Sequence, residues 1–238
     1  MKYLIYTIIL FAFVASCAPD KPKKDHILIF SETKGFRHSS IEDGKDALWK
    51  VCEEKGFKVD TTENSAIMTT ENLEKYAAVI FLCTTGDIFN EAEQSAFEGY
   101  IRNGGGYVGI HSAADTEYDW PWYGKLAGAY FESHPKQQEA VIQVLDKSHP
   151  AMKHLPDEWV KWDEWYNYKN LNPEVHVLAN LDESSYEGGK NGKNHPIAWC
   201  QEYEGGKMFY TGLGHTEKSY TNPDFLKHVW GGIEYVIK

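Results

Sequence analysis

Short apolar runs without charged residues recur through the first half of this chain. They lie at 27–30, 79–83 and 107–110, and the last run follows a turn of three glycines. A strand that is apolar throughout is buried on both faces, as in a parallel sheet covered by helices. The segments 40–55 and 90–102 between these runs place their apolar residues at helical spacing. This alternation predicts an α/β fold with a parallel sheet and helices on both faces.

The second half of the chain has a different pattern. The segments 196–202 and 207–213 flank Glu204, Gly205 and Gly206, which predicts a β-hairpin. The segment 141–145 is expected to form an edge or antiparallel strand, and the last helix begins near Asn222 and packs back on the sheet. With 238 residues the chain can hold one large domain. We therefore expect a parallel sheet with an antiparallel hairpin extension.

The first residues have the features of a secretory signal. Lys2 precedes an apolar run over 4–14, which is shorter than the ~20 residues of a membrane-spanning helix. Ala15 and Ser16 come directly before Cys17, as in a lipobox. We expect residues 1–16 to be a lipoprotein signal peptide, 17–25 a lipid-attached polar tether and 26–238 the folded domain. The protein would be anchored to a membrane only by lipid at Cys17, on its periplasmic or cell-surface face.

Charge and cysteine content narrow the function. The formal net charge is -11, so the chain lacks the excess of positive charge that is typical of nucleic-acid-binding proteins. Beyond Cys17 the chain has Cys52, Cys83 and Cys200, an odd set that implies no disulfide framework. Cys83 and Cys200 lie in strand-like apolar runs and are expected to be small buried side chains.

Histidines mark several turns. His111 ends an apolar strand, His38 lies in the loop after the first strand, and His215 follows the last predicted strand. His134 lies in a turn between them. If the strands are parallel, their carboxyl ends bring the first three together at one rim. Three interpretations stay open: a site for a divalent metal such as zinc, catalytic or sugar-contacting histidines without metal, and structural roles.

A carboxylate and several aromatic rings complete the candidate site. Glu164 lies between Trp162, Trp165 and Tyr166, where partial burial would raise its pKa toward the range useful for proton transfer. Flat aromatic faces suit sugar rings, although they are equally common in cores. We assign catalytic roles to His38, His111, Glu164 and His215; metal binding, if a metal is bound, to His38, His111, His134 and His215; and substrate contacts to Arg37, Asp115, Trp120, Trp122, His134 and Tyr166.

Common nucleophile and cofactor motifs are absent from the sequence. No GxSxG elbow occurs, and the strand end where a nucleophile would stand carries His111. The glycines 104–106 precede their strand instead of following it, so they do not form a dinucleotide fingerprint.

Taken together, the motifs resemble those of the ThuA-like (trehalose utilisation) family. They run in order along the chain and comprise Gly35-Phe36-Arg37-His38-Ser39-Ser40-Ile41, Gly105 to Ser112, Phe131-Glu132-Ser133-His134-Pro135, Asp163-Glu164-Trp165-Tyr166 and Gly214-His215-Thr216. The resemblance implies a flavodoxin-like fold related to the class I glutamine amidotransferases. Those enzymes have a nucleophilic cysteine at a strand-to-helix elbow, where this chain has His111. The resemblance also implies a role in disaccharide catabolism, including that of sugars oxidised at carbon 3.

Three functions follow from these observations. The first is an enzyme acting on a disaccharide or its 3-keto derivative, by hydrolysis, isomerisation or related proton transfer without a cysteine nucleophile. The second is a sugar-binding lipoprotein without catalysis, and the third is a structural domain that serves a partner protein. Titratable groups converging at strand ends favour the enzyme, since stacking on a sugar does not require them.

Overall fold

The computed structural model describes residues 24–238. The expected signal peptide, Cys17 and most of the tether lie outside these residues. Within the described part, no helix has the length and the apolar character needed to cross a membrane.

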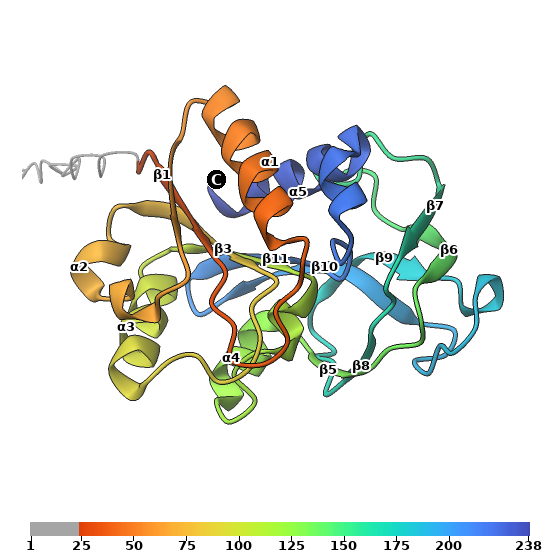
Figure 1. Cartoon of the computed structure of the whole chain (residues 1–238), viewed down its shortest axis with the longest axis horizontal. Coiled ribbons are helices and arrows are strands. Elements are labelled where there is room, and N and C mark those ends of the chain that lie inside the picture. Colours follow the sequence, from red (N-terminus) through yellow and green to blue (C-terminus); the bar gives the residue numbers. More distant parts are fainter. Residues whose placement is uncertain (1–23) are drawn as a thin grey trace, which may run out of the picture.

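Five parallel strands form one half of the main sheet (Figure 1). Their order is β2-β1-β3-β4-β11, which is the flavodoxin-like order with β11 in the fifth position. The strands are β1 (His26–Phe30), β2 (Lys58–Thr62), β3 (Tyr76–Leu82), β4 (Gly106–Ile110) and β11 (Gly206–Thr211). The apolar runs thus form the central strands, as the sequence predicts.

Helices cover both faces of this half. Figure 1 shows α1 and α5 on one face and α2, α3 and α4 on the other. Their bounds are α1 (Ile41–Glu54), α2 (Thr70–Leu73), α3 (Glu91–Arg102), α4 (Pro121–Ala127) and α5 (Pro223–Val236). The α/β fold with helices on both faces is confirmed.

Local sequence explains where these helices begin and how closely they pack. Asn90 accepts hydrogen bonds from the first turn of α3 while Glu93 reaches back to the Asn90 backbone, which is the capping box that the sequence predicts. On the opposite face, a Cβ atom at Gly232 of α5 would lie 2.1 Å from the Phe209 ring of β11. Glycine therefore lets α5 lie directly against the strand that leads to His215.

Antiparallel strands extend the sheet beyond β11. The order continues β11-β10-β9-β6-β7, with β10 (His195–Tyr203), β9 (His176–Leu181), β6 (Gln138–Val144) and β7 (Glu158–Asp163). The hairpin of β10 and β11 is confirmed. β6 is antiparallel but not an edge strand, because it pairs with both β7 and β9. The two strands β5 (Tyr130–Ser133) and β8 (Asn167–Lys169) form a second, small antiparallel sheet.

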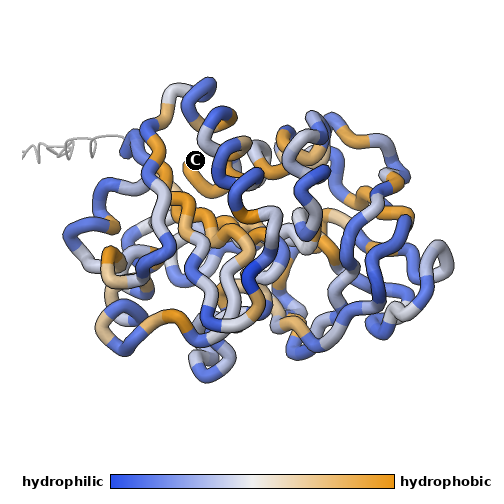
Figure 2. The backbone as a smooth tube through the Cα atoms, in the orientation of Figure 1, coloured by the Kyte–Doolittle hydropathy of each residue, from blue (hydrophilic) through white to orange (hydrophobic). Residues whose placement is uncertain are grey.

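The core follows the central strands. Figure 2 shows hydrophobic residues concentrated along these strands and hydrophilic residues in the outer turns. Residues 27–30 and 78–83 are buried, as are Cys52 and Cys200. The cysteines 52, 83 and 200 are free, in agreement with the sequence, and burial raises the pKa of Cys83 to about 12. Burial also raises the pKa of Cys52 to about 12 and that of Cys200 to about 11, which favours the protonated thiol at neutral pH.

Candidate functional site

Four predicted side chains meet at the carboxyl ends of the strands. His38 comes from the loop after β1, His111 follows β4, Glu164 follows β7 and His215 follows β11. One ligand atom from each lies within 4.8 Å of the ligand atoms of the other three. The three histidines converge here because the parallel strands β1, β4 and β11 end at the same edge of the sheet. We call these four residues the His–Glu cluster.

His111 has a fixed ring orientation. Its φ of 52° lies in the left-handed region, a strained conformation for a non-glycine residue at the end of a strand. Its Nδ1 lies 2.9 Å from the carbonyl oxygen of Gly212, so Nδ1 carries the proton and donates it. The other nitrogen, Nε2, therefore presents a lone pair to the cluster, 3.1 Å from Nδ1 of His215. The Tyr166 ring packs on the imidazole at 4.3 Å between centroids.

His38 is held neutral inside the cluster. Its Nδ1 lies 3.3 Å from the Ser112 hydroxyl, and its ring makes edge contacts with the rings of His111 and His215. Burial lowers the pKa of His38 to about 3, with the neighbouring histidines acting in the same direction. A neutral imidazole is the form that ligates metals.

Glu164 connects the cluster to the protein surface. Its Oε2 lies 3.2 Å from His215 Nδ1 and 3.6 Å from His111 Nε2, and its Oε1 lies 3.1 Å from His134 Nδ1. Burial acts to raise the Glu164 pKa, but the neighbouring imidazoles of His111 and His215 outweigh it and hold the pKa well below its usual range. The expectation of a raised pKa is therefore wrong, because the aromatic neighbours bury the carboxylate without removing its imidazole partners.

Asp163 is a site residue that the sequence prediction missed. Its carboxylate is fully buried and accepts hydrogen bonds from the backbone N–H groups of Glu164 (2.9 Å), Gly214 (2.9 Å) and His215 (3.1 Å). The Ser219 hydroxyl donates a fourth, at 3.2 Å. One side chain thus links the two segments that present Glu164 and His215. Its place beside Glu164 in the Asp-Glu-Trp-Tyr motif is the signal that could have identified it.

The cluster opens into a pocket of about 420 Å³, a volume typical of small-molecule sites. Among the predicted residues, His134, Asp115 and Tyr166 line it. Two further rings were not predicted, namely Phe36, which is 67% exposed, and Phe131, which packs on Tyr166 at 4.3 Å. The pocket is therefore polar at the cluster and aromatic on its walls.

Three predicted substrate contacts lie elsewhere. Arg37 pairs with Glu42 and Glu63. Trp120 and Trp122 stack on each other. The indole N–H of Trp120 donates to Glu98 on α3, and that of Trp122 donates to Glu204 in the turn before β11. None of the three lines the pocket. The two tryptophans belong to the packing between α4, α3 and the hairpin, which local sequence cannot distinguish from a sugar platform.

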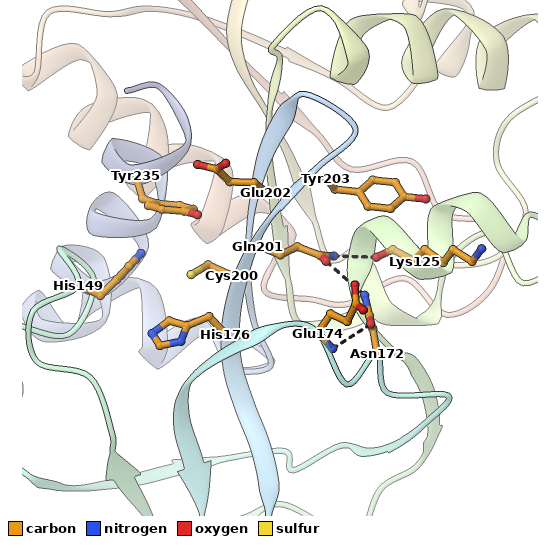
Figure 3. A pocket seen from close by; sticks show the side chains of 10 residues that line it. All are labelled: Lys125, His149, Asn172, Glu174, His176, Cys200, Gln201, Glu202, Tyr203 and Tyr235. Carbon is orange, nitrogen blue, oxygen red and sulfur yellow. Dashed lines mark hydrogen bonds between the residues drawn. The ribbon is translucent and has the colours of Figure 1, made fainter.

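A larger hollow of about 690 Å³ lies at the other end of β10 (Figure 3). It surrounds Gln201 and Glu202, which pair with Met208 and Lys207 in the first half of β11, whereas His215 follows the end of that strand. Its polar groups are dispersed and several are already engaged: His176 pairs with Asp146 at 2.8 Å, and Gln201 donates to the carbonyl of Lys125. No metal-ligating group of the described residues forms here. The smaller pocket is therefore the candidate site.

The spacing of three members of the His–Glu cluster fits a metal ion. Ligands bound about 2.1 Å from one zinc ion lie roughly 3.0–3.5 Å apart. The distances of 3.1, 3.2 and 3.6 Å among His111, His215 and Glu164 are close to these values. The hydrogen bonds of Gly212 to His111 and of Ser112 to His38 supply the outer contacts that orient imidazole ligands. His134, also predicted as a ligand, contacts Glu164 but lies outside the group of four.

The fold and the site together define an α/β protein with a three-histidine, one-carboxylate cluster at the carboxyl edge of its sheet. A family model described as trehalose utilisation, ThuA, matches residues 26–236. The chain belongs to the ThuA family, and a carbohydrate-related function follows from this membership. No curated protein matches the chain.

Solved structures share the fold. A ThuA-like protein from Bacteroides uniformis ATCC 8492 is 26% identical with a TM-score of 0.77, covering 94% of this chain and 95% of that one. A ThuA-like protein from Parabacteroides merdae ATCC 43184 is 22% identical with a TM-score of 0.73, covering 91% of each chain. A β-galactosidase from Bacillus circulans sp. alkalophilus is 14% identical with a TM-score of 0.59, and the match covers 90% of this chain but 31% of the enzyme. The last likeness concerns the fold alone.

Proposed function

We propose that this protein is a metal-dependent enzyme that acts on a disaccharide or its 3-keto derivative. The observation that carries the proposal is the His–Glu cluster, with four ligand atoms within 4.8 Å at the base of an aromatic pocket. Gathering three imidazoles and a carboxylate requires desolvating all of them, which stacking on a sugar would not need. Membership of the trehalose utilisation family supports a carbohydrate as the substrate.

The metal is expected to be held by His38, His111, Glu164 and His215. When bound, a divalent ion such as zinc would polarise a sugar oxygen or acidify a bound water. The chain itself prepares the ligands: Gly212 fixes the His111 tautomer, and burial keeps His38 neutral. Among residues 24–238 no thiol lines the pocket, and the chemistry proposed uses no cysteine nucleophile.

His134 is placed to move protons between the pocket and water. Its side chain is 42% exposed, and Nδ1 lies 3.1 Å from Oε1 of Glu164. Glu164, held as the carboxylate, pairs with His134 through this contact and orients its imidazole. Phe36, Phe131 and Tyr166 provide flat faces for the sugar rings, and Asp115 offers hydrogen bonds to hydroxyl groups. These roles suit hydrolysis, isomerisation or another proton-transfer reaction at a sugar.

The test is turnover of purified protein on a panel of disaccharides and 3-keto-disaccharides, followed by product analysis. We expect product from wild type, and a loss of at least about a hundredfold in His111→Ala and Glu164→Gln, with the sugar still bound. His154→Ala is the matched control and should keep full activity, because the half-buried His154 lies outside the pocket and contacts the Asp224 carbonyl. Sugar binding without turnover that survives His111→Ala would contradict the proposal and favour a sugar-binding lipoprotein.

A further inference from the structure

A second hollow lies beside the candidate site. It has a volume of about 480 Å³ and is lined by Trp159, Lys161 and Trp162 of β7 and by Thr216, Lys218 and Ser219 after β11. Thr216 follows His215 in the chain, and Trp162 precedes Glu164 by two residues. The same two segments therefore supply residues to the cluster and to the second hollow.

This hollow carries two cations in an otherwise acidic protein. Among residues 24–238, neither Lys161 nor Lys218 makes a salt bridge, although the net charge of the chain is -11. Lys161 is half-buried, with Nζ 5.4 Å from the centroid of the Trp159 ring. Burial lowers the pKa of Lys161.

Nearby carboxylates are already engaged. The Asp163 carboxylate accepts four hydrogen bonds, and Asp224 lies 3.7 Å from Lys227. A partly desolvated cation without a direct counterion favours an anionic ligand.

An exposed aromatic ring borders these lysines. Trp162 is 56% exposed, although it lies on β7, the last strand of the main sheet. A large exposed ring of this kind next to a hollow indicates a binding surface, and its flat face suits a sugar. The hollow thus combines a stacking surface with positive charge.

We propose that the hollow binds an anionic sugar residue, carrying a carboxylate or a sulfate, that is joined to the sugar held in the His–Glu pocket. The inference deepens the proposed function, on which it rests, by naming acidic disaccharides as the substrate class. Lys161 and Lys218 would pair with the anionic group, and Trp162 would stack on the ring that carries it.

Binding of matched sugars tests this assignment. Calorimetry on the full chain would compare trehalose with its 6-carboxylate and its 6-sulfate at low ionic strength, and the two acids distinguish the two kinds of anion. We expect at least one acid to bind about tenfold more tightly than trehalose, with this preference weakening as salt is added. In the double variant Lys161→Met and Lys218→Met the preference should fall below about twofold, while trehalose affinity is kept. Lys50→Met, an exposed lysine on α1, is the control.

Lys161→Arg keeps the charge and should retain the preference. If it does, loss of the preference in the methionine variants is due to the missing charge and not to the substitution of the lysine as such. Equal binding of acidic and neutral sugars, a preference that survives in the double variant, or no binding of any of the three sugars would overturn the inference. The enzyme proposal is tested independently by turnover. If no turnover is found but the lysine-dependent preference is, the enzyme proposal is wrong and the anionic sugar site is still supported.

Discussion

The Asp163 carboxylate accepts a hydrogen bond of 3.1 Å from the backbone N–H of His215, and this contact fixes one side of the candidate site to the other. The same oxygen accepts the N–H of Glu164 at 2.9 Å. Because Glu164 follows β7 and His215 follows β11, a buried carboxylate sets the distance between two members of the His–Glu cluster. Asp163 is therefore a positioning residue for the cluster.

Asp163→Asn should weaken metal binding without removing a ligand. An amide keeps the size of the side chain but loses charge and one acceptor, so the turn carrying His215 is held less firmly. We expect zinc affinity to fall by about 10- to 100-fold and the free energy of unfolding by about 1–3 kcal/mol. Zinc titration and urea unfolding measure the two effects, with the exposed Asp157→Asn as control. Unchanged zinc affinity would contradict the positioning role.

Metal removal should lower thermal stability. A ligand at a hundred times its dissociation constant stabilises the folded state by about 2.7 kcal/mol, which for a domain of this size corresponds to a rise of roughly 5–10 °C in Tm. We expect chelator-treated protein to gain this shift when zinc is restored. His111→Ala should abolish the shift, and His154→Ala, which changes a half-buried histidine outside the cluster, should keep it. A shift of equal size in His111→Ala would place the metal elsewhere.

Buried histidines should make the protein sensitive to mild acid. His228 lies on α5 and faces β11, with Nδ1 3.2 Å from the Ala151 carbonyl and Nε2 3.0 Å from the Thr211 hydroxyl. Burial lowers its pKa from 6.5 to about 3. The folded state therefore binds fewer protons than the unfolded state below pH 6.5, and the stabilisation present above pH 6.5 is lost as the pH falls toward 3.

For His228 alone, the loss between pH 7.5 and pH 5 is about 2 kcal/mol. His228→Gln does not titrate in this range, so its stability should decline less over the interval by about that amount. Urea unfolding at the two pH values measures the difference, with His154→Gln as the control substitution. If His228→Gln and wild type lose the same stability between the two pH values, the buried imidazole is not the cause.

The membrane anchor stays a prediction from sequence. Ala15, Ser16 and Cys17 form the lipobox, and we propose that lipid at Cys17 holds the protein at the membrane. Cys17→Ser should move the protein from the membrane fraction to the soluble fraction of the native host, as judged by immunoblotting after cell fractionation. A variant that remains in the membrane fraction would show that the anchor lies elsewhere.

The sequence predicts the fold well because its strongest signals are local. Apolar runs without alternation mark β1, β3 and β4, and the Asn90–Glu93 capping box marks the start of α3. Convergence of His38, His111 and His215 then follows from the rule that parallel strands end at one edge. Glu164 reaches these histidines by another route. It follows β7, the last strand of the antiparallel extension, and the chain after β7 returns to the segment that follows β11. The periodicity of the sequence does not predict this return.

Side-chain partners are harder to predict than strand ends. The Glu164 pKa depends on two imidazoles more than fifty residues away in the sequence, so its direction could not be deduced from the neighbouring aromatics. Trp120 has the composition of a sugar platform but donates its indole N–H to Glu98 of α3. Conversely, Phe36 lines the pocket although a lone exposed ring in a loop gives no local signal.

These placements predict opposite effects for two aromatic substitutions. Phe36 is 67% exposed at the pocket wall, so Phe36→Ala should raise the KM for the sugar substrate severalfold and change the free energy of unfolding by less than about 0.5 kcal/mol. Trp120 is buried and packs against Tyr123 and Trp122, so Trp120→Ala should destabilise the fold by about 3–5 kcal/mol. Its KM, measured below the unfolding temperature, should stay within about twofold of wild type, because the ring does not reach the pocket. Steady-state kinetics and urea unfolding of both variants measure these effects. A KM effect confined to Trp120→Ala would contradict the assignment and show that the sugar binds near α4.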